Sequence, residues 1–148
     1  MTTTPRKRPA NTTPRERSDQ RALFEWAAAQ ACKYPALALM YAIPNGQYRK
    51  GQGMEPGTRA GFPDAALPVA RGCWFGLFVE LKREKGGVVA AEQLAWHNAL
   101  RLQGYRVAVC KGFDEAQQMV MAYLGSGPFR GVTIGEEEVA RVQRGGAA

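Results

Sequence analysis

The most restrictive feature of the sequence is the segment from Leu77 to Lys82, in which an apolar run carries two charged side chains. A β-strand here would place its three aliphatic residues on one face and Phe78, Glu80 and Lys82 on the other. Burial of a charge is costly unless the charge is paired, bound to a metal or placed at the rim of a solvent-filled site. The segment therefore predicts either a charged functional site or a surface strand with a cross-strand ion pair.

A second carboxylate precedes this strand, at Asp64. The short apolar segment from Pro63 to Leu67 is typical of a strand, and as a neighbour in the sheet it would bring Asp64 beside Glu80. Two carboxylates and a lysine that converge in a cleft can hold a hard divalent cation and place water against a phosphodiester. The two strands together therefore indicate a candidate site for metal-assisted chemistry.

The remaining pattern predicts an α/β fold, with a mixed β-sheet of about four strands flanked by helices. The strand–helix–strand order in the second half favours a parallel pair, whereas the earlier strands favour antiparallel pairing. Helices are expected over Gln20–Lys33, Ala90–Gln103 and Asp114–Leu124, and strands over Leu37–Ile43, Pro63–Leu67, Phe75–Lys82 and Tyr105–Cys110.

The expected domain occupies residues 18–124 and has a tail on each side. Residues 1–17 are rich in Thr, Pro and Arg and predict a disordered basic arm. Residues 125–148 predict a tail that is either flexible or packed on a second subunit. The formal net charge is +7, and the first 21 residues carry +4 of it. This distribution favours a polyanionic partner such as nucleic acid, although basic tails also occur without one.

The segment from Asn45 to Gly61 is rich in glycine and carries basic and aromatic side chains. Glycines let backbone amides approach a phosphate, and such side chains suit a nucleic-acid backbone and an unstacked base. A disordered excursion between strands is the alternative. Together with the basic residues that follow the strand at 77–82, the candidate nucleic-acid-binding residues are Asn45, Tyr48, Arg49, Lys50, Arg59, Arg83 and Lys85.

The predicted helices carry three polar residues of interest. Glu25 lies off the apolar stripe of the first helix, on a face of small residues, and a solvated glutamate is the alternative. Gln93 lies on the expected inward face of the second helix, together with Trp96 and Leu100. His97 is one position off that face, so its pattern is typical of a surface or structural residue rather than a metal ligand.

Composition argues against a membrane or secreted protein. No apolar run approaches the roughly 18 to 20 residues that span a bilayer, and the N-terminus lacks the segment order of a secretory signal. Cys32, Cys73 and Cys110 are far apart and odd in number, so we expect small apolar core residues in a reducing compartment. The expected location is the cytoplasm.

Five short motifs stand in order along the chain: Pro44-Asn45-Gly46, Gly61-Phe62-Pro63-Asp64, Val79-Glu80-Leu81-Lys82, Gln93 with Trp96, and Gly104-Tyr105-Arg106-Val107. In this order they resemble the VRR-NUC domain of the PD-(D/E)XK nuclease superfamily. The resemblance covers about Glu25 to Leu124, which is most of the chain outside its tails. It implies a restriction-endonuclease-like core with the element order αβββαβ.

The resemblance also implies a metal-dependent nuclease that uses Mg²⁺ or Mn²⁺ and no organic cofactor. By this resemblance Asp64 and Glu80 are metal ligands, helped by the backbone carbonyl of Leu81. Lys82 would orient water or stabilise the negative charge that develops on the phosphate. Two carboxylates in a basic cleft suit Mg²⁺, which keeps several of its waters.

Two helix residues also match the family pattern. Gln93 resembles the helix glutamine of the motif, and Glu25 matches the acidic residue that members carry on the first helix, so both are expected in the catalytic site and Glu25 also at the metal. One position departs from the pattern, because members usually place serine or a similar cap three residues before the glutamine and this chain has Ala90. The helix start is therefore expected to fray or to be capped by a neighbour.

Standalone members of the family, often from phages and bacteria, resemble small dimers that act on branched DNA such as four-way junctions. The resemblance therefore implies a structure-specific DNA endonuclease that forms a homodimer. The alternative is a non-catalytic nucleic-acid-binding or assembly module, in which the basic arm and loop bind and the carboxylates are structural.

Overall fold

The computed structural model describes residues 14–44, 55–132, 140 and 144. None of the helices within these ranges is both long and apolar enough to cross a membrane. The elements in chain order are α1 (Pro14–Gln30), the 3₁₀ helix η1 (Pro35–Leu39), β1 (Tyr41–Ala42), β2 (Ala65–Leu67), β3 (Leu77–Lys82), α2 (Ala91–Leu102), β4 (Arg106–Lys111) and α3 (Gly112–Leu124).

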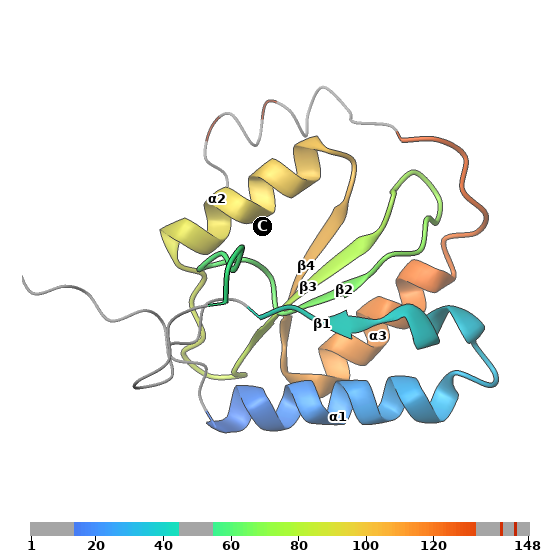
Figure 1. Ribbon diagram of the computed structural model, residues 1–148, viewed down its shortest axis with the longest axis horizontal. Helices are drawn as coiled ribbons and strands as arrows, with labels where there is room; N and C mark the ends of the chain where they lie inside the picture. The colour runs from blue at the N-terminus through green and yellow to red at the C-terminus, as the bar shows by residue number, and fades with distance from the viewer. Residues whose placement is uncertain (1–13, 45–54, 133–139, 141–143, 145–148) are drawn as a thin grey trace, which may run out of the picture.

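The four strands form one mixed sheet in the order β1-β2-β3-β4 (Figure 1). β2 is antiparallel to both of its neighbours, and β3 and β4 are parallel. This confirms the predicted α/β fold, in which the antiparallel strands come first and the parallel pair encloses a helix. The parallel pair requires a crossover connection, which α2 provides.

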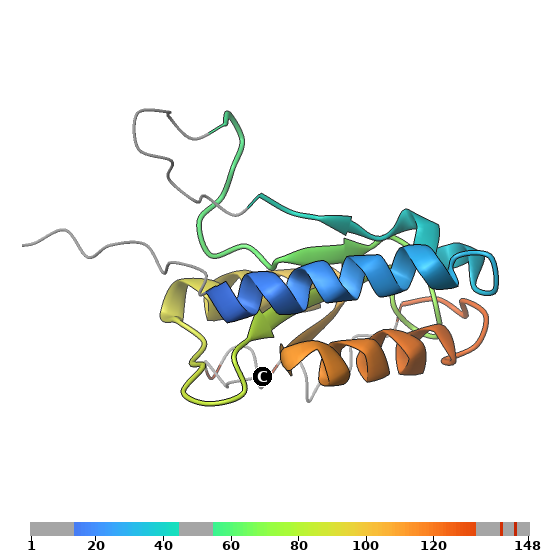
Figure 2. The same cartoon turned by 90° about the horizontal axis from the view of Figure 1, so that it is seen from below.

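The core lies on the face of β3 that carries Leu77, Val79 and Leu81, as the strand pattern predicted. α1 and α3 lie side by side against this face, and α2 lies on the opposite face of the sheet (Figure 2). Leu23 of α1 and Val120 of α3 are fully buried there. β3 is therefore covered on both faces, by an apolar layer on one side and by α2 on the side of Glu80 and Lys82.

The first helix begins earlier than predicted. We expected an unstructured arm through residue 17, but α1 begins at Pro14. Proline fits the first helical turn because the amide hydrogen that it lacks would have no partner there, and its fixed φ angle is already helical. The part of the predicted arm over residues 1–13 and most of the tail beyond residue 132 lie outside the described residues.

The strand predicted over Leu37–Ile43 was largely wrong. The chain instead forms η1 and a strand of two exposed residues, Tyr41 and Ala42. Leu37 is buried whereas Leu39 is exposed, so the aliphatic residues do not share one face as a period of two requires. Pro35 at the start of η1 also favours a helical turn.

The prediction that the cysteines are core residues holds for one of three. Cys32 is exposed and Cys73 is partly exposed, whereas Cys110 on β4 is buried. Burial, with a smaller contribution from the nearby Glu115 carboxylate, raises the pKa of the Cys110 thiol to about 12. A thiol with this pKa is almost wholly protonated at neutral pH and therefore unreactive.

We expect Leu23→Ala to lower the free energy of unfolding by about 2 to 5 kcal/mol, because it removes a fully buried side chain between α1 and the sheet. Leu39→Ala is the matched control, since Leu39 is 55% exposed. Its effect should stay within about 0.5 kcal/mol. Urea denaturation followed by circular dichroism measures both values, and similar losses in the two variants would contradict the described core.

Thiol labelling at pH 8 should modify Cys32 quickly and leave Cys110 unmodified until the protein unfolds. At this pH only about one Cys110 side chain in ten thousand would be a thiolate, and the fraction would rise as the pH increases towards 12. A Cys32→Ser variant should lose the fastest labelling phase. Rapid modification of Cys110 in the folded protein, identified by mass spectrometry, would contradict its burial.

Candidate active site

Asp64 is held by the backbone on both sides. Its amide donates a hydrogen bond to the carbonyl of Val79 at 3.0 Å, and its carbonyl accepts one from the amide of Ile43 at 2.8 Å. The side chain then turns along β3, where Oδ2 accepts a hydrogen bond from the amide of Leu81 at 2.7 Å. Asp64 therefore lies beside β3. Because Ala65 pairs with Val79 in the antiparallel register, Asp64 lies opposite Glu80.

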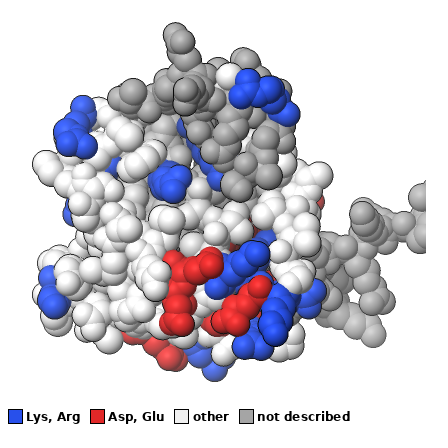
Figure 3. Space-filling model, turned by 180° about the vertical axis from the view of Figure 1, so that it is seen from behind, with Lys and Arg blue, Asp and Glu red and all other residues white. Residues whose placement is uncertain are grey.

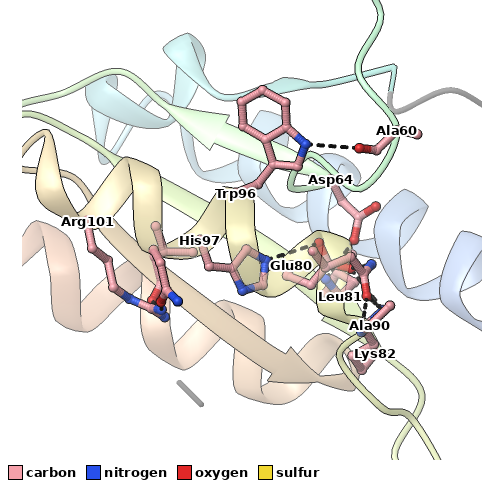
Figure 4. Close-up of polar contacts among 12 residues, drawn as sticks. Ala60, Asp64, Glu80, Leu81, Lys82, Ala90, Trp96, His97 and Arg101 are labelled. Atoms are coloured by element: carbon pink, nitrogen blue, oxygen red, sulfur yellow. Dashed lines mark hydrogen bonds and ion pairs between the residues drawn. The ribbon is translucent and has the colours of Figure 1, made fainter. Parts of the chain in front are cut away.

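Glu80, Lys82 and Gln93 form a closed network between β3 and α2. Figure 4 labels the two charged members, Glu80 and Lys82. Oε1 of Glu80 accepts a hydrogen bond from Nε2 of Gln93 at 2.6 Å and lies 3.0 Å from Nζ of Lys82. Nζ of Lys82 also donates to Oε1 of Gln93 at 2.9 Å. Each of the three side chains contacts the other two, so the strand spacing and the helix position together fix the group.

Gln93 also caps the start of α2. Its Oε1 accepts a hydrogen bond from the amide of Ala90 at 2.9 Å, and Ala90 itself has no side chain that could cap the helix. The sequence predicted fraying or a cap from a neighbour at this helix start. The amide of Ala90 is instead satisfied from inside the helix, by the glutamine three residues later, which is half of a capping box. One side chain therefore joins the helix start to the charged strand.

The buried face of α2 is not the face that the sequence predicted. Its buried residues are Gln93, His97 and Arg101, whereas Trp96 and Leu100 are only partly buried. The helix is thus rotated by about one residue step, roughly 100°, from the expected orientation. The prediction assumed that the inward face is apolar, but this face covers a strand surface that carries Glu80 and Lys82. His97, expected to be a surface or structural residue, is fully buried beside Glu80.

The loop before Asp64 is attached to α2. Nε1 of Trp96 donates a hydrogen bond to the carbonyl of Ala60 at 3.0 Å, and the Trp96 ring packs edge-on against Phe62. Gly61 has a φ of +79°, and a β-carbon there would lie 2.9 Å from Cγ of Glu92. A larger residue would therefore be strained and would push the loop away from the helix. The loop that leads to Asp64 is therefore packed closely on the start of α2.

The three charged groups are removed from solvent. Glu80 is 1% exposed, and Asp64 and Lys82 are each 8% exposed. With both carboxylates ionised, the group carries one more negative than positive charge. Buried charge that is not balanced is costly, and a bound cation is a common way to balance it.

The residues present fit a divalent cation of the magnesium type. Asp64 and Glu80 offer two carboxylates, and the Leu81 amide points past the end of β2 towards Asp64. The amide and carbonyl of one residue face the same antiparallel neighbour, so the Leu81 carbonyl also points to this side. No group of three or more His, Cys, Asp or Glu side chains within the described ranges could hold a metal, which argues against a zinc-type site. Mg²⁺ needs few protein ligands because it keeps several waters.

Glu25 lies apart from this group. It is exposed, and it stands about half a turn from Leu23 and Ala27, which face the core. The acidic residue of α1 that reaches the charged strand is Glu16, whose Oε1 accepts a hydrogen bond from the Arg83 amide at 3.3 Å. The sequence prediction missed Glu16 because it assigned this residue to the disordered arm. We therefore leave Glu25 out of the site.

Three of the candidate DNA-binding residues are described, and all three are exposed: Arg59, Arg83 and Lys85. Arg83 and Lys85 directly follow the end of β3. Basic and acidic side chains gather in the same region of the face in Figure 3, so the described part of that face is not a continuous basic surface. The other candidates, Asn45, Tyr48, Arg49 and Lys50, lie outside the described residues.

The fold and the site together define an α/β protein with a restriction-endonuclease-like core. Residues 50–114 match the model of the VRR-NUC domain family. A solved structure described as a VRR_NUC domain protein is 26% identical, with a TM-score of 0.66, and the match covers 84% of this chain and 99% of that chain. The match over residues 50–114 and the shared fold support a VRR-NUC domain in this chain, and the resemblance inferred from the five motifs is confirmed.

A second solved structure, described as a VRR_NUC domain, is 22% identical, with a TM-score of 0.50. The match covers 75% of this chain and 99% of that chain, and it supports the fold alone. Among curated proteins, none matches the chain. The VRR-NUC domain that residues 50–114 match implies a nuclease family.

Replacing Gln93 by leucine should lower the free energy of unfolding by about 1 to 3 kcal/mol. The change leaves the Ala90 amide and two buried charged groups each with one partner fewer. Gln118→Leu, at an exposed position of α3, is the matched control and should stay within about 0.5 kcal/mol of the wild type. Guanidinium denaturation measures both variants, and equal values would show that the network adds nothing to stability.

Proposed function

We propose that the chain is a metal-dependent DNA endonuclease that hydrolyses phosphodiester bonds with Mg²⁺ or Mn²⁺. The observation that carries this proposal is the buried group of Asp64, directly before β2, with Glu80 and Lys82 on the neighbouring β3. Two carboxylates and one ammonium suit a cation and a phosphate together, because the carboxylates repel a phosphate unless a cation lies between them. The match to the VRR-NUC family supports the same activity.

The residues of the site would have different roles in the reaction. Asp64 and Glu80, with the carbonyl of Leu81, would hold the cation. When bound, a divalent cation neutralises charge on the phosphate and lowers the pKa of a coordinated water. Lys82 would supply a fixed positive charge where negative charge grows, and this charge is already oriented before the substrate arrives. Gln93 keeps Lys82 and Glu80 in contact through its two hydrogen bonds.

For the substrate, we propose branched DNA such as a four-way junction, cut by a homodimer. Standalone members of the family, which the sequence resembles, are the model for this proposal. A symmetric dimer would present two copies of the site to two strands of a symmetric junction. The exposed Arg59, Arg83 and Lys85 would contact the DNA backbone.

Cleavage of labelled DNA tests the proposal. The purified full chain is incubated with four-way junction, flap, single-stranded and linear duplex DNA, each with Mg²⁺, with Mn²⁺ or with a chelator. We expect cleavage with either metal, fastest on the junction, and none with the chelator. Glu80→Gln should slow cleavage by about 100-fold or more, because it removes a charged ligand that the transition state requires.

Glu25→Gln is the matched control, since it makes the same chemical change at an exposed position of α1. It should cleave at the wild-type rate, and a large loss would return Glu25 to the site. Cleavage that persists in chelator or in folded Glu80→Gln protein would contradict a metal-dependent nuclease. Binding to every DNA without cleavage would favour a non-catalytic module instead.

A further inference from the structure

His97 is a buried polar side chain that the proposed reaction does not use. It is 0% exposed and lies on the buried face of α2, one helical turn after Gln93. Its Nε2 lies 3.7 Å from Oε2 of Glu80, the contact drawn in Figure 4. Among the described residues, neither nitrogen of the ring has a hydrogen-bond partner, and Oε2 of Glu80 has none either.

The two oxygens of Glu80 are in different environments. Oε1 accepts a hydrogen bond from Nε2 of Gln93 at 2.6 Å and lies 3.0 Å from Nζ of Lys82. These two donors fill both of its acceptor positions. Oε2 has its full acceptor capacity left. This oxygen is therefore the one that remains for a cation, and it has room for one further N–H donor. Within the described ranges, the polar side chain that lies against Oε2 is His97.

Packing alone does not account for a histidine at this position. A buried polar group without a hydrogen-bond partner destabilises the folded protein, whereas leucine would fill a similar volume without that loss. The distance of 3.7 Å between Nε2 and Oε2 is only roughly half an ångström beyond hydrogen-bond range. A small adjustment of either side chain would close it.

We propose that His97 is a positioning residue, which donates its Nε2 hydrogen to Oε2 of Glu80 and so orients this carboxylate for the divalent cation. Together with Gln93 on Oε1, the histidine would hold both ends of the carboxylate from a single helix. The inference rests on the proposed function of Glu80 as a metal ligand. Groups that orient a ligand in this way typically change metal affinity by 10- to 100-fold when removed.

Three substitutions separate orientation from packing. His97→Gln keeps a donor at the distance of Nε2 from the backbone, His97→Asn moves the donor to the position of Nδ1, and His97→Leu removes it at similar volume. Mn²⁺ affinity is measured by calorimetry on the full chain without DNA, and thermal unfolding monitored by circular dichroism shows whether each variant is folded. Cleavage rates at saturating metal are recorded for the same proteins.

We expect His97→Gln to bind Mn²⁺ within about threefold of the wild type, and His97→Asn and His97→Leu to bind about 10- to 100-fold more weakly. Saturating metal should restore most of the cleavage rate of the weak binders. If the leucine variant does not fold, the glutamine and asparagine variants still decide the question, since both carry an amide and differ only in its reach.

Wild-type affinity in the asparagine and leucine variants would overturn the inference. An equal loss in all three variants, in parallel with their thermal stability, would overturn it as well and assign His97 to packing. A wild-type chain that binds no Mn²⁺ would instead contradict the proposed function, and the inference with it. The wild-type measurement therefore distinguishes the two failures.

Discussion

The structure depends on how the chain stabilises Glu80, a carboxylate that is 1% exposed in the middle of the sheet. Its charge is balanced by Lys82 on the same strand and by a hydrogen bond from Gln93 on the facing helix. Loss of the Gln93 hydrogen bond would leave this buried carboxylate with one partner fewer, which is destabilising, so the contact favours packing of α2 on β3 at Gln93. The same contact begins the helix, through the Ala90 amide. The Gln93 side chain thus both packs α2 against the sheet and joins the charged group.

The opposite face of β3 gives the site its rigidity. Leu77, Val79 and Leu81 are buried against α1 and α3, so the strand that carries Glu80 and Lys82 is fixed from behind. Asp64 is held by backbone hydrogen bonds to both neighbouring strands. Sites built on strands and helices hold their geometry more accurately than sites on loops. The charged groups are therefore already close to one another before any cation or DNA is present.

Several features could be predicted because they depend on neighbours in sequence. The two faces of β3 and the mixed sheet follow from short-range patterns, and the structure confirms both. Other predictions were wrong, either because the sequence pattern fits two structures or because tertiary contacts outweigh it. The start of α1 at Pro14 and the 3₁₀ turn at Pro35 depend on proline positions that suit both a helix start and a break.

The sequence by itself determined that Glu80 and Lys82 share a face, because the alternation of side chains in a strand is a local property of the backbone. Only the tertiary structure decided which side of α2 covers that face. The hydrophobic pattern favoured Trp96 and Leu100, whereas the charged strand surface selects Gln93 and His97, since polar groups there can be paired. The contact of Glu16 with the end of β3 is also decided by tertiary structure. The packing of α1 against the sheet determines which residue of the helix lies next to Arg83.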